Sequence, residues 1–206
     1  MTGDSTPQDP ARPQHVDSSV PHTARVWNYW LGGKDNYIAD RRLGDQIQEV
    51  IPDIVASARA DRGFLGRAVR HLAGEAGIRQ FLDLGTGLPT AGNTHEVAQA
   101  IAPEARIVYV DNDRLLEAVP SGSHLAIAHP TGEVNGEAAQ QAVDMSNDAG
   151  VAPMCLRSRA ELERFFDGLE LLEPGVVSCS QWRADVRDVD RPPAPVYQFC
   201  GLGRKH

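Results

Sequence analysis

The sequence lacks the features that direct a protein to nucleic acid or to a membrane. Its 206 residues carry 20 Lys and Arg against 28 Asp and Glu, a net charge of −8, so there is no basic excess to neutralise a phosphate backbone. No apolar run approaches the ~20 residues that span a bilayer, and the N-terminus has no apolar signal-peptide core. We therefore expect a cytoplasmic protein that binds neither nucleic acid nor a membrane.

Metal and disulfide patterns are also missing. Cys155, Cys179 and Cys200 are odd in number and widely spaced, and no C-x-x-C pair occurs. The seven histidines include no H-E-x-x-H pair. We expect three reduced thiols and no metal site.

The distribution of proline and apolar residues divides the chain. Residues 1–21 are rich in Pro, Ser, Thr and Asp with little to bury, so we predict a disordered tail. The remaining length suits one α/β domain at 22–206, with N-terminal helices at 22–77 and an α/β core at 78–206. Apolar spacing predicts helices over residues 24–31, 43–55 (with a kink or break at Pro52) and 64–72. The first ends at Gly32-Gly33 and is either a capped helix and turn or a lid over a ligand site.

The chain is organised around residues 80–93, Q-F-L-D-L-G-T-G-L-P-T-A-G-N. A short apolar run ends in Gly85 and Gly87, the pattern by which a buried parallel strand enters a ligand-binding turn. Glycine permits a tight reversal and lets a ligand approach the backbone. Asn93 is a predicted helix N-cap, with Glu96 completing a capping box.

Residues 106–110 form a second predicted strand that ends in Asp111 and Asn112. An acidic residue at this place can accept hydrogen bonds from a ribose, and the alternative is a helix-cap or turn acid. Further along, we predict strands at 124–128, 169–177 and 196–200 and helices at 137–148 and 157–166.

The G-x-G turn alone does not identify a cofactor. A dinucleotide fingerprint requires a third glycine where this sequence has Thr90, which disfavours an NAD-dependent oxidoreductase. Asp83, two residues before Gly85, instead completes the D-x-G-x-G pattern of S-adenosylmethionine-dependent methyltransferases.

Four ordered segments make the resemblance specific. Residues 24–40 (A-R-V-W-N-Y-W-L-G-G-K-D-N-Y-I-A-D), 81–99, 108–113 (V-Y-V-D-N-D) and 164–177 resemble a bacterial family of S-adenosylmethionine-dependent methyltransferases formerly filed as a domain of unknown function. The resemblance implies a Rossmann-like class I methyltransferase sheet with helices on both faces and an N-terminal helical extension. It also implies S-adenosyl-L-methionine as cofactor and a small-molecule methyl acceptor.

The resemblance also implies site residues. Asp83, Gly85 and Gly87 would surround the methionine part of the cofactor, and Asp111 would bind the ribose hydroxyls. Leu88 and Asn112 complete the candidate cofactor set. A turn-stabilising carboxylate is the alternative for Asp83.

The sequence departs from the family after Asp113. It runs directly into residues that resemble the approach to the fifth strand, so two βα units of ~30 residues, carrying strands 3 and 4, are predicted to be absent. Strand one must then pair with the fifth-like strand or present a free edge through which the chain could self-associate. The chain would be either a methyltransferase of impaired activity or a non-catalytic S-adenosylmethionine-binding module.

No catalytic residue can be assigned from the sequence. His129, at the end of the predicted strand 124–128, is either a general base or a histidine of a strand-end turn.

Overall fold

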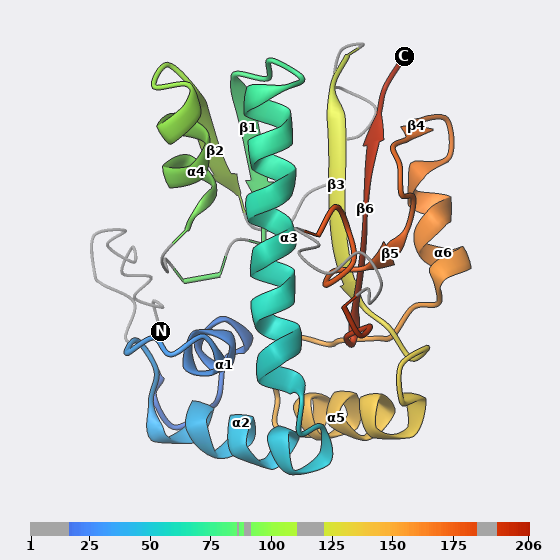
Figure 1. The fold of residues 1–206 in the computed structure, drawn as a ribbon. Helices are drawn as coiled ribbons and strands as arrows, with labels where there is room; N and C mark the ends of the chain where they lie inside the picture. The colour runs from blue at the N-terminus through green and yellow to red at the C-terminus, as the bar shows by residue number, and fades with distance from the viewer. Residues whose placement is uncertain (1–16, 86, 89–91, 111–121, 185–192) are drawn as a thin grey trace, which may run out of the picture.

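One long helix, α3 (Ile54–Gly74), is the central element of the fold (Figure 1). The structure is a computed structural model that describes residues 17–85, 87–88, 92–110, 122–184 and 193–206. Different positions of α3 belong to three separate hydrophobic clusters, one with the other N-terminal helices and one with each of two sheets. The core is therefore built around this helix. No helix in these ranges is long and apolar enough to cross a membrane.

The N-terminal helices pack at the start of α3. Helices α1 (Thr23–Trp30) and α2 (Ile38–Val50) form a cluster with the first turns of α3 and with α5 (Gly136–Asp148). The predicted break at Pro52 is confirmed, because α2 ends at Val50 and α3 begins at Ile54. The predicted pattern at 64–72 is part of the same α3.

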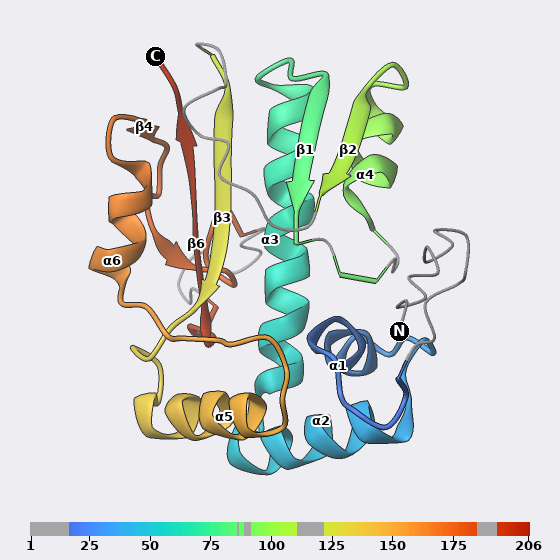
Figure 2. The same ribbon diagram turned by 180° about the vertical axis from the view of Figure 1, so that it is seen from behind.

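The first sheet has two parallel strands, β1 (Gln80–Leu84) and β2 (Arg106–Val110). Phe81 and Ile107 pack against α3 and α4 (Thr94–Ile101) on one face. The opposite face holds Leu82, Leu84 and Val108, whose exposed fractions are 44%, 46% and 58%. Figure 2 shows no helix in front of this face of β1 and β2.

The second sheet is antiparallel and is covered on both faces. Its order is β3 (His124–Pro130), β6 (Gln198–Arg204) and β4 (Glu170–Leu171), with β5 (Val177–Ser178) also pairing β6. Cys200 and Leu202 of β6 face α3. Phe199 of β6 faces α6 (Arg159–Glu163) and the 3-10 turn η1 (Arg164–Phe166).

Two glycines allow η1 to lie directly on β6. A Cβ at Gly203 would come within 2.8 Å of the Phe166 ring, and one at Gly201 within 3.0 Å. The close contact of ring and backbone therefore requires glycine at both positions.

The structure confirms the mixed α/β class but corrects parts of the predicted architecture. The single strand predicted at 169–177 is wrong, because it is interrupted between β4 and β5. Pro174 has no N–H for a ladder, and Gly175 has a φ of +83°. Helices cover both faces of the second sheet but only one face of the first, within the described ranges.

The two sheets stay separate in the described residues. β1, β2 and β3 point the same way in Figure 1, and no backbone ladder joins β1 to β3. Thirteen residues, 111–123, connect β2 to β3. The predicted loss of two strands falls on this connection, and residues 111–121 of it lie outside the described residues.

The N-terminal tail is described only from residue 17 onward. The carbonyls of Asp17 and Val20 accept hydrogen bonds from Arg25, at 3.2 and 2.6 Å. The rest of the predicted tail lies outside the described residues.

Candidate functional site

The candidate site begins where β1 ends. Gly85 and Gly87 have φ values of +73° and +63°, a left-handed conformation that favours glycine. A Cβ at Gly85 would meet nothing within 4 Å, so the turn is open on that side. A ligand can thus approach the backbone at the carboxyl end of β1, as the glycine pattern predicts.

Asp83 is the acidic group nearest this turn. It is half-buried, and its Oδ2 accepts a hydrogen bond of 2.5 Å from Thr94 Oγ1, at the start of α4. No hydrogen bond to Oδ1 is present within the described residues. One oxygen therefore fixes the carboxylate, and the other can accept a ligand donor.

The start of α4 is held by its own cap. The predicted capping box is confirmed, because Asn93 and Glu96 bond reciprocally. Glu96 Oε2 accepts from the backbone N–H groups of Gly92 and Asn93, at 2.7 and 2.9 Å. These two hydrogen bonds lower the pKa of Glu96. The carboxylate remains charged at the helix N-terminus, where it interacts favourably with the helix dipole.

An aromatic pair lies beside the cap. Tyr109 is the register partner of Asp83 on β2, and its hydroxyl accepts a hydrogen bond of 3.0 Å from His95 N. The same hydroxyl is 2.5 Å from His95 Nδ1. Strand β2 is thereby joined to the beginning of α4 next to the candidate site.

Helix α1 lies against the glycine turn. A Cβ at Gly87 would be 3.7 Å from Ala24 Cβ, an ordinary van der Waals distance. The fully buried Asp40 holds the start of α1, accepting from Arg25 Nε at 2.8 Å and from His22 N at 2.9 Å. Helix α1 is thus both capped and placed beside the glycine turn. The two alternatives predicted for it, a capped helix and turn or a lid over a ligand site, are therefore compatible.

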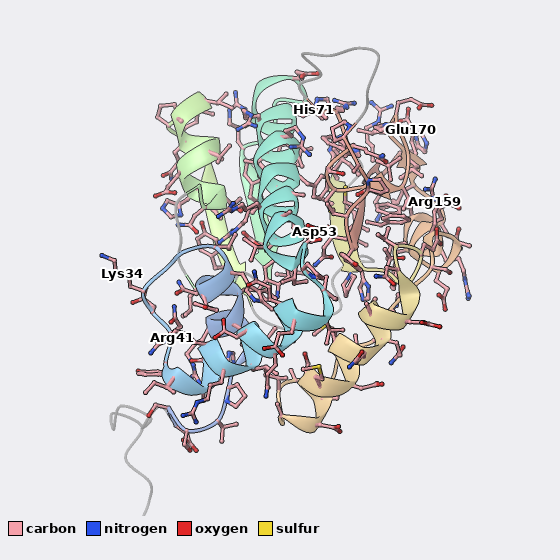
Figure 3. The ribbon with its side chains drawn as sticks, turned by 60° about the horizontal axis from the view of Figure 1, so that its bottom comes forward. Lys34, Arg41, Asp53, His71, Arg159 and Glu170 are labelled. Carbon is pink, nitrogen blue, oxygen red and sulfur yellow. The ribbon has the colours of Figure 1, made fainter. Side chains whose placement is uncertain are left out.

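The turn after α1 is built by Asn28. Its buried Oδ1 accepts from Asp35 N and Asn36 Nδ2, both at 3.0 Å. Gly33 must be glycine, because a Cβ there would lie 2.3 Å from the Asn28 amide. Lys34 points away from the protein (Figure 3).

His129 is not available as a base. Its Nδ1 lies 2.9 Å from the Pro130 carbonyl, to which it donates, and Nε2 then accepts from Arg157 Nη1. Burial lowers the pKa of His129, and the Arg157 charge lowers it further. Both ring nitrogens of the neutral imidazole are therefore engaged, which supports the strand-end interpretation.

Four of the six predicted cofactor residues lie together. Asp83 lies in the last part of β1, and Gly85, Gly87 and the half-buried Leu88 follow the end of this strand. Asp111 and Asn112 lie outside the described residues, as does Thr90. Sequence reasoning missed Thr94 as the partner of Asp83, although its place directly after the predicted cap was a usable signal.

The cysteines and the other potential metal ligands form no metal-binding cluster in the part of the chain that the structure describes. Among the described residues, no group of three or more His, Cys, Asp and Glu is arranged to hold a metal ion. Cys179 and Cys200 are buried, and Cys155 is exposed.

Comparison with known proteins adds a family. The model described as S-adenosyl methyltransferase matches residues 9–116 and 113–206. A DUF574 family protein from Streptomyces avermitilis MA-4680 has a similar solved structure, with 33% identity and a TM-score of 0.85 over 92% of this chain and 99% of that chain. A candidate methyltransferase from Thermobifida fusca YX has 32% identity and a TM-score of 0.84 over 96% and 99%. None of the curated proteins matches the sequence.

Proposed function

Because this chain belongs to the S-adenosyl methyltransferase family, we propose that it binds S-adenosyl-L-methionine and methylates a small-molecule acceptor. The observation that carries the proposal is the open glycine turn at the end of β1, with Asp83 fixed beside it by Thr94. Ligands of open α/β sheets bind outside the carboxyl ends of the strands, where this turn lies.

The residues at the turn suit the amino-acid end of the cofactor. Asp83 Oδ1 can accept a hydrogen bond from the ligand ammonium, while Thr94 keeps the carboxylate in place. Gly85 and Gly87 allow the backbone to approach the ligand without a Cβ. We propose that Leu88 contacts the ligand next to this turn and that Asp111 and Asn112 bind its ribose.

The contribution of this chain to the reaction is positioning. S-adenosylmethionine supplies the reactive sulfonium methyl group. The turn and Asp83 orient the ligand, and α1 lies within van der Waals distance of the Gly87 side of the turn. The absence of a free base at His129 is compatible with this role, because an acceptor that is already nucleophilic needs none.

We further propose that the two βα units carrying strands 3 and 4 are absent and that this absence weakens activity. The family model matches the chain in two segments that meet at residues 113–116, the place at which the sequence departs from the family. The uncovered face at Leu82 and Val108 and the separation of β1 from β3 support the same interpretation. Ligand contacts from the loops after strands 3 and 4 would then be missing.

A non-catalytic binding module is the second candidate. It is favoured by the same separation of the sheets, because Thr94 fixes Asp83 without any contact from the second sheet. Binding of the cofactor product without methyl transfer is the behaviour that identifies this candidate.

Self-association is proposed through β1, whose edge away from β2 has no strand partner in the described residues. An unpaired strand edge with apolar side chains beside it is a site for pairing with another copy. The cytoplasmic location and the lack of nucleic-acid binding expected from the sequence stay predictions.

Calorimetric titration with S-adenosylhomocysteine and with NAD tests the proposal. We expect heat with the first ligand and none with the second. Asp83→Asn keeps an acceptor for Thr94 but removes the charge, so the affinity should fall about tenfold to a hundredfold. The matched control is Asp148→Asn, an exposed carboxylate at the end of α5, which should leave the affinity unchanged.

Two results would contradict the proposal. Absence of heat with S-adenosylhomocysteine in the unmodified protein refutes cofactor binding altogether. Binding without product formation across a panel of amine, hydroxyl and thiol acceptors refutes methyl transfer and identifies the binding module.

A further inference from the structure

A pocket lies at the opposite end of the sheets from the glycine turn. It has a volume of about 280 Å³ and is lined by the last turns of α3 and by a loop between β5 and β6: Arg67, Arg70, His71, Glu75, Trp182 and Arg183. Glu75 directly follows α3 and precedes β1, so the pocket lies at the amino end of β1. Figure 3 shows His71 at one end of α3 and Asp53 at the other.

The lining of this pocket is basic although the chain is acidic. Three arginines and one histidine face a single carboxylate, whereas the whole chain carries a net charge of −8. Arg67 is fixed there, since Nε donates to the Trp182 carbonyl at 2.7 Å and Nη2 to the Cys179 carbonyl at 2.6 Å. Arg70 is exposed, and no ion pair or hydrogen bond of its side chain is present within the described residues.

Trp182 supplies a donor that has no partner. The residue is fully buried and lines the pocket, yet its indole N–H makes no hydrogen bond in the described part of the chain. A buried N–H without an acceptor costs free energy that a bound acceptor would recover. The Arg183 guanidinium lies 5.0 Å above the indole ring.

Arg183 is held in the pocket wall at a conformational cost. Its φ is +42°, in the left-handed region that non-glycine residues seldom adopt. Its Nε donates to the Glu173 carbonyl at 3.2 Å, and Nη1 lies 2.9 Å from His71 Nδ1. The backbone therefore presents this guanidinium at one defined place.

The carboxylate of Glu75 lies beside the cations of the pocket, where a bound anion would lie. Its Oε2 lies 2.8 Å from His71 Nδ1, the same atom that faces Arg183 Nη1. One ring nitrogen cannot accept from Arg183 and donate to Glu75 at the same time. Because the Glu75 side chain is 73% exposed, it can move into solvent and leave the cations to another anion.

We propose that this pocket binds a phosphate-type oxyanion, either the free ion or a small phosphate monoester, in competition with Glu75. Arginine forks match the geometry of phosphate oxygens, and the Trp182 N–H adds a neutral donor. The volume is at the lower end of ligand pockets, which suits a small molecule. This site is independent of the methyltransferase site.

Titration with inorganic phosphate at constant ionic strength tests the proposal by nuclear magnetic resonance of the assigned Trp182 indole N–H. We expect a saturable shift of this resonance at millimolar phosphate, while the indole resonances of Trp27 and Trp30 stay in place. Arg70→Gln should weaken binding about tenfold, because one charge-assisted interaction is lost. Arg59→Gln is the matched control, since Arg59 is also an exposed arginine of α3 but does not line the pocket.

Glu75→Gln should tighten phosphate binding severalfold, because it removes the competing charge. A titration with glycerol 3-phosphate distinguishes the ligand sources: tighter binding than inorganic phosphate identifies a monoester, and equal binding identifies the free ion. The proposal is overturned if the Trp182 resonance shows no saturable shift up to tens of millimolar phosphate. It is also overturned if Arg59→Gln weakens binding as much as Arg70→Gln does.

Discussion

The carboxyl group of Asp61 makes the stability of the core depend on pH, and this dependence can be tested. This residue of α3 is half-buried, and its Oδ1 lies 3.9 Å from the Cys179 thiol. Burial raises the pKa of Asp61 from 3.8 to about 6, against the opposing effects of the Arg62 charge and the Cys179 thiol. Folding therefore favours the protonated carboxyl group.

The direction and size of the pH dependence follow from this pKa. Below pH 3.8 the carboxyl group is protonated in both states, and the fold keeps its full stability. As the pH rises, the unfolded chain ionises first, so the free energy of unfolding falls until the pH passes the folded-state pKa of about 6. The difference between the two pKa values corresponds to a loss of about 3 kcal/mol at neutral pH.

Asp61→Asn removes this loss, because the amide has no charge to bury. We expect the variant to match the unmodified protein near pH 3 and to exceed its free energy of unfolding by about 3 kcal/mol at pH 7. Urea unfolding followed by tryptophan fluorescence at a series of pH values measures the difference. Asp148→Asn, in which the replaced carboxylate is exposed, is the control and should change the free energy of unfolding by less than about 0.5 kcal/mol at pH 7.

A constant difference between Asp61→Asn and the unmodified protein from pH 4 to pH 8 would refute the reasoning. The reasoning would also be refuted if the free energy of unfolding of Asp61→Asn fell, relative to that of the unmodified protein, as the pH rises.

Three further perturbations address packing and association. Gly203→Ala on β6 places a Cβ within 2.8 Å of the Phe166 ring of η1, so it should lower the free energy of unfolding by about 1–3 kcal/mol, measured in urea. Gly136→Ala is the control and should not lower it, because a Cβ there meets nothing within 4 Å. Asp40→Ala leaves the largely buried Arg25 without its ion-pair partner and should lower the free energy of unfolding by about 3 kcal/mol in the same assay. A decrease below about 1 kcal/mol would contradict a stabilising role of this pair. Leu84→Lys places a charge beside the unpaired edge of β1, so it should convert a dimer into a monomer in sedimentation velocity. An unmodified protein that is monomeric at all concentrations would contradict association through this edge.

Local signals in the sequence predicted local structure well. The helix cap at Asn93 and Glu96 is confirmed, because its partners are three residues apart. The strand predicted at 106–110 has the same bounds as β2, since the apolar run I-V-Y-V there is bounded by Arg106 and Asp111. The interruption between β4 and β5 was also legible, because Pro174-Gly175 is a turn signal that the single predicted strand ignored.

Contacts between distant segments could not be predicted in this way. The hydrogen bond from Thr94 to Asp83 and the contact between Ala24 and Gly87 depend on how helices and strands pack, and no periodicity specifies either. The basic pocket is a still clearer case, because Arg70 and Arg183 line the same pocket only after the loop between β5 and β6 has packed on α3.

The central position of α3 has a consequence for hydrogen exchange. In the described residues no backbone ladder joins β1 to β3, so the unit of β1, β2 and α4 is attached to the rest of the fold through side-chain packing on α3. Such a unit can open locally at a lower free energy than global unfolding. Amides of β1 and β2 should therefore exchange faster than those of α3 and β6. A ligand at the glycine turn would slow them selectively, because it binds only the closed unit.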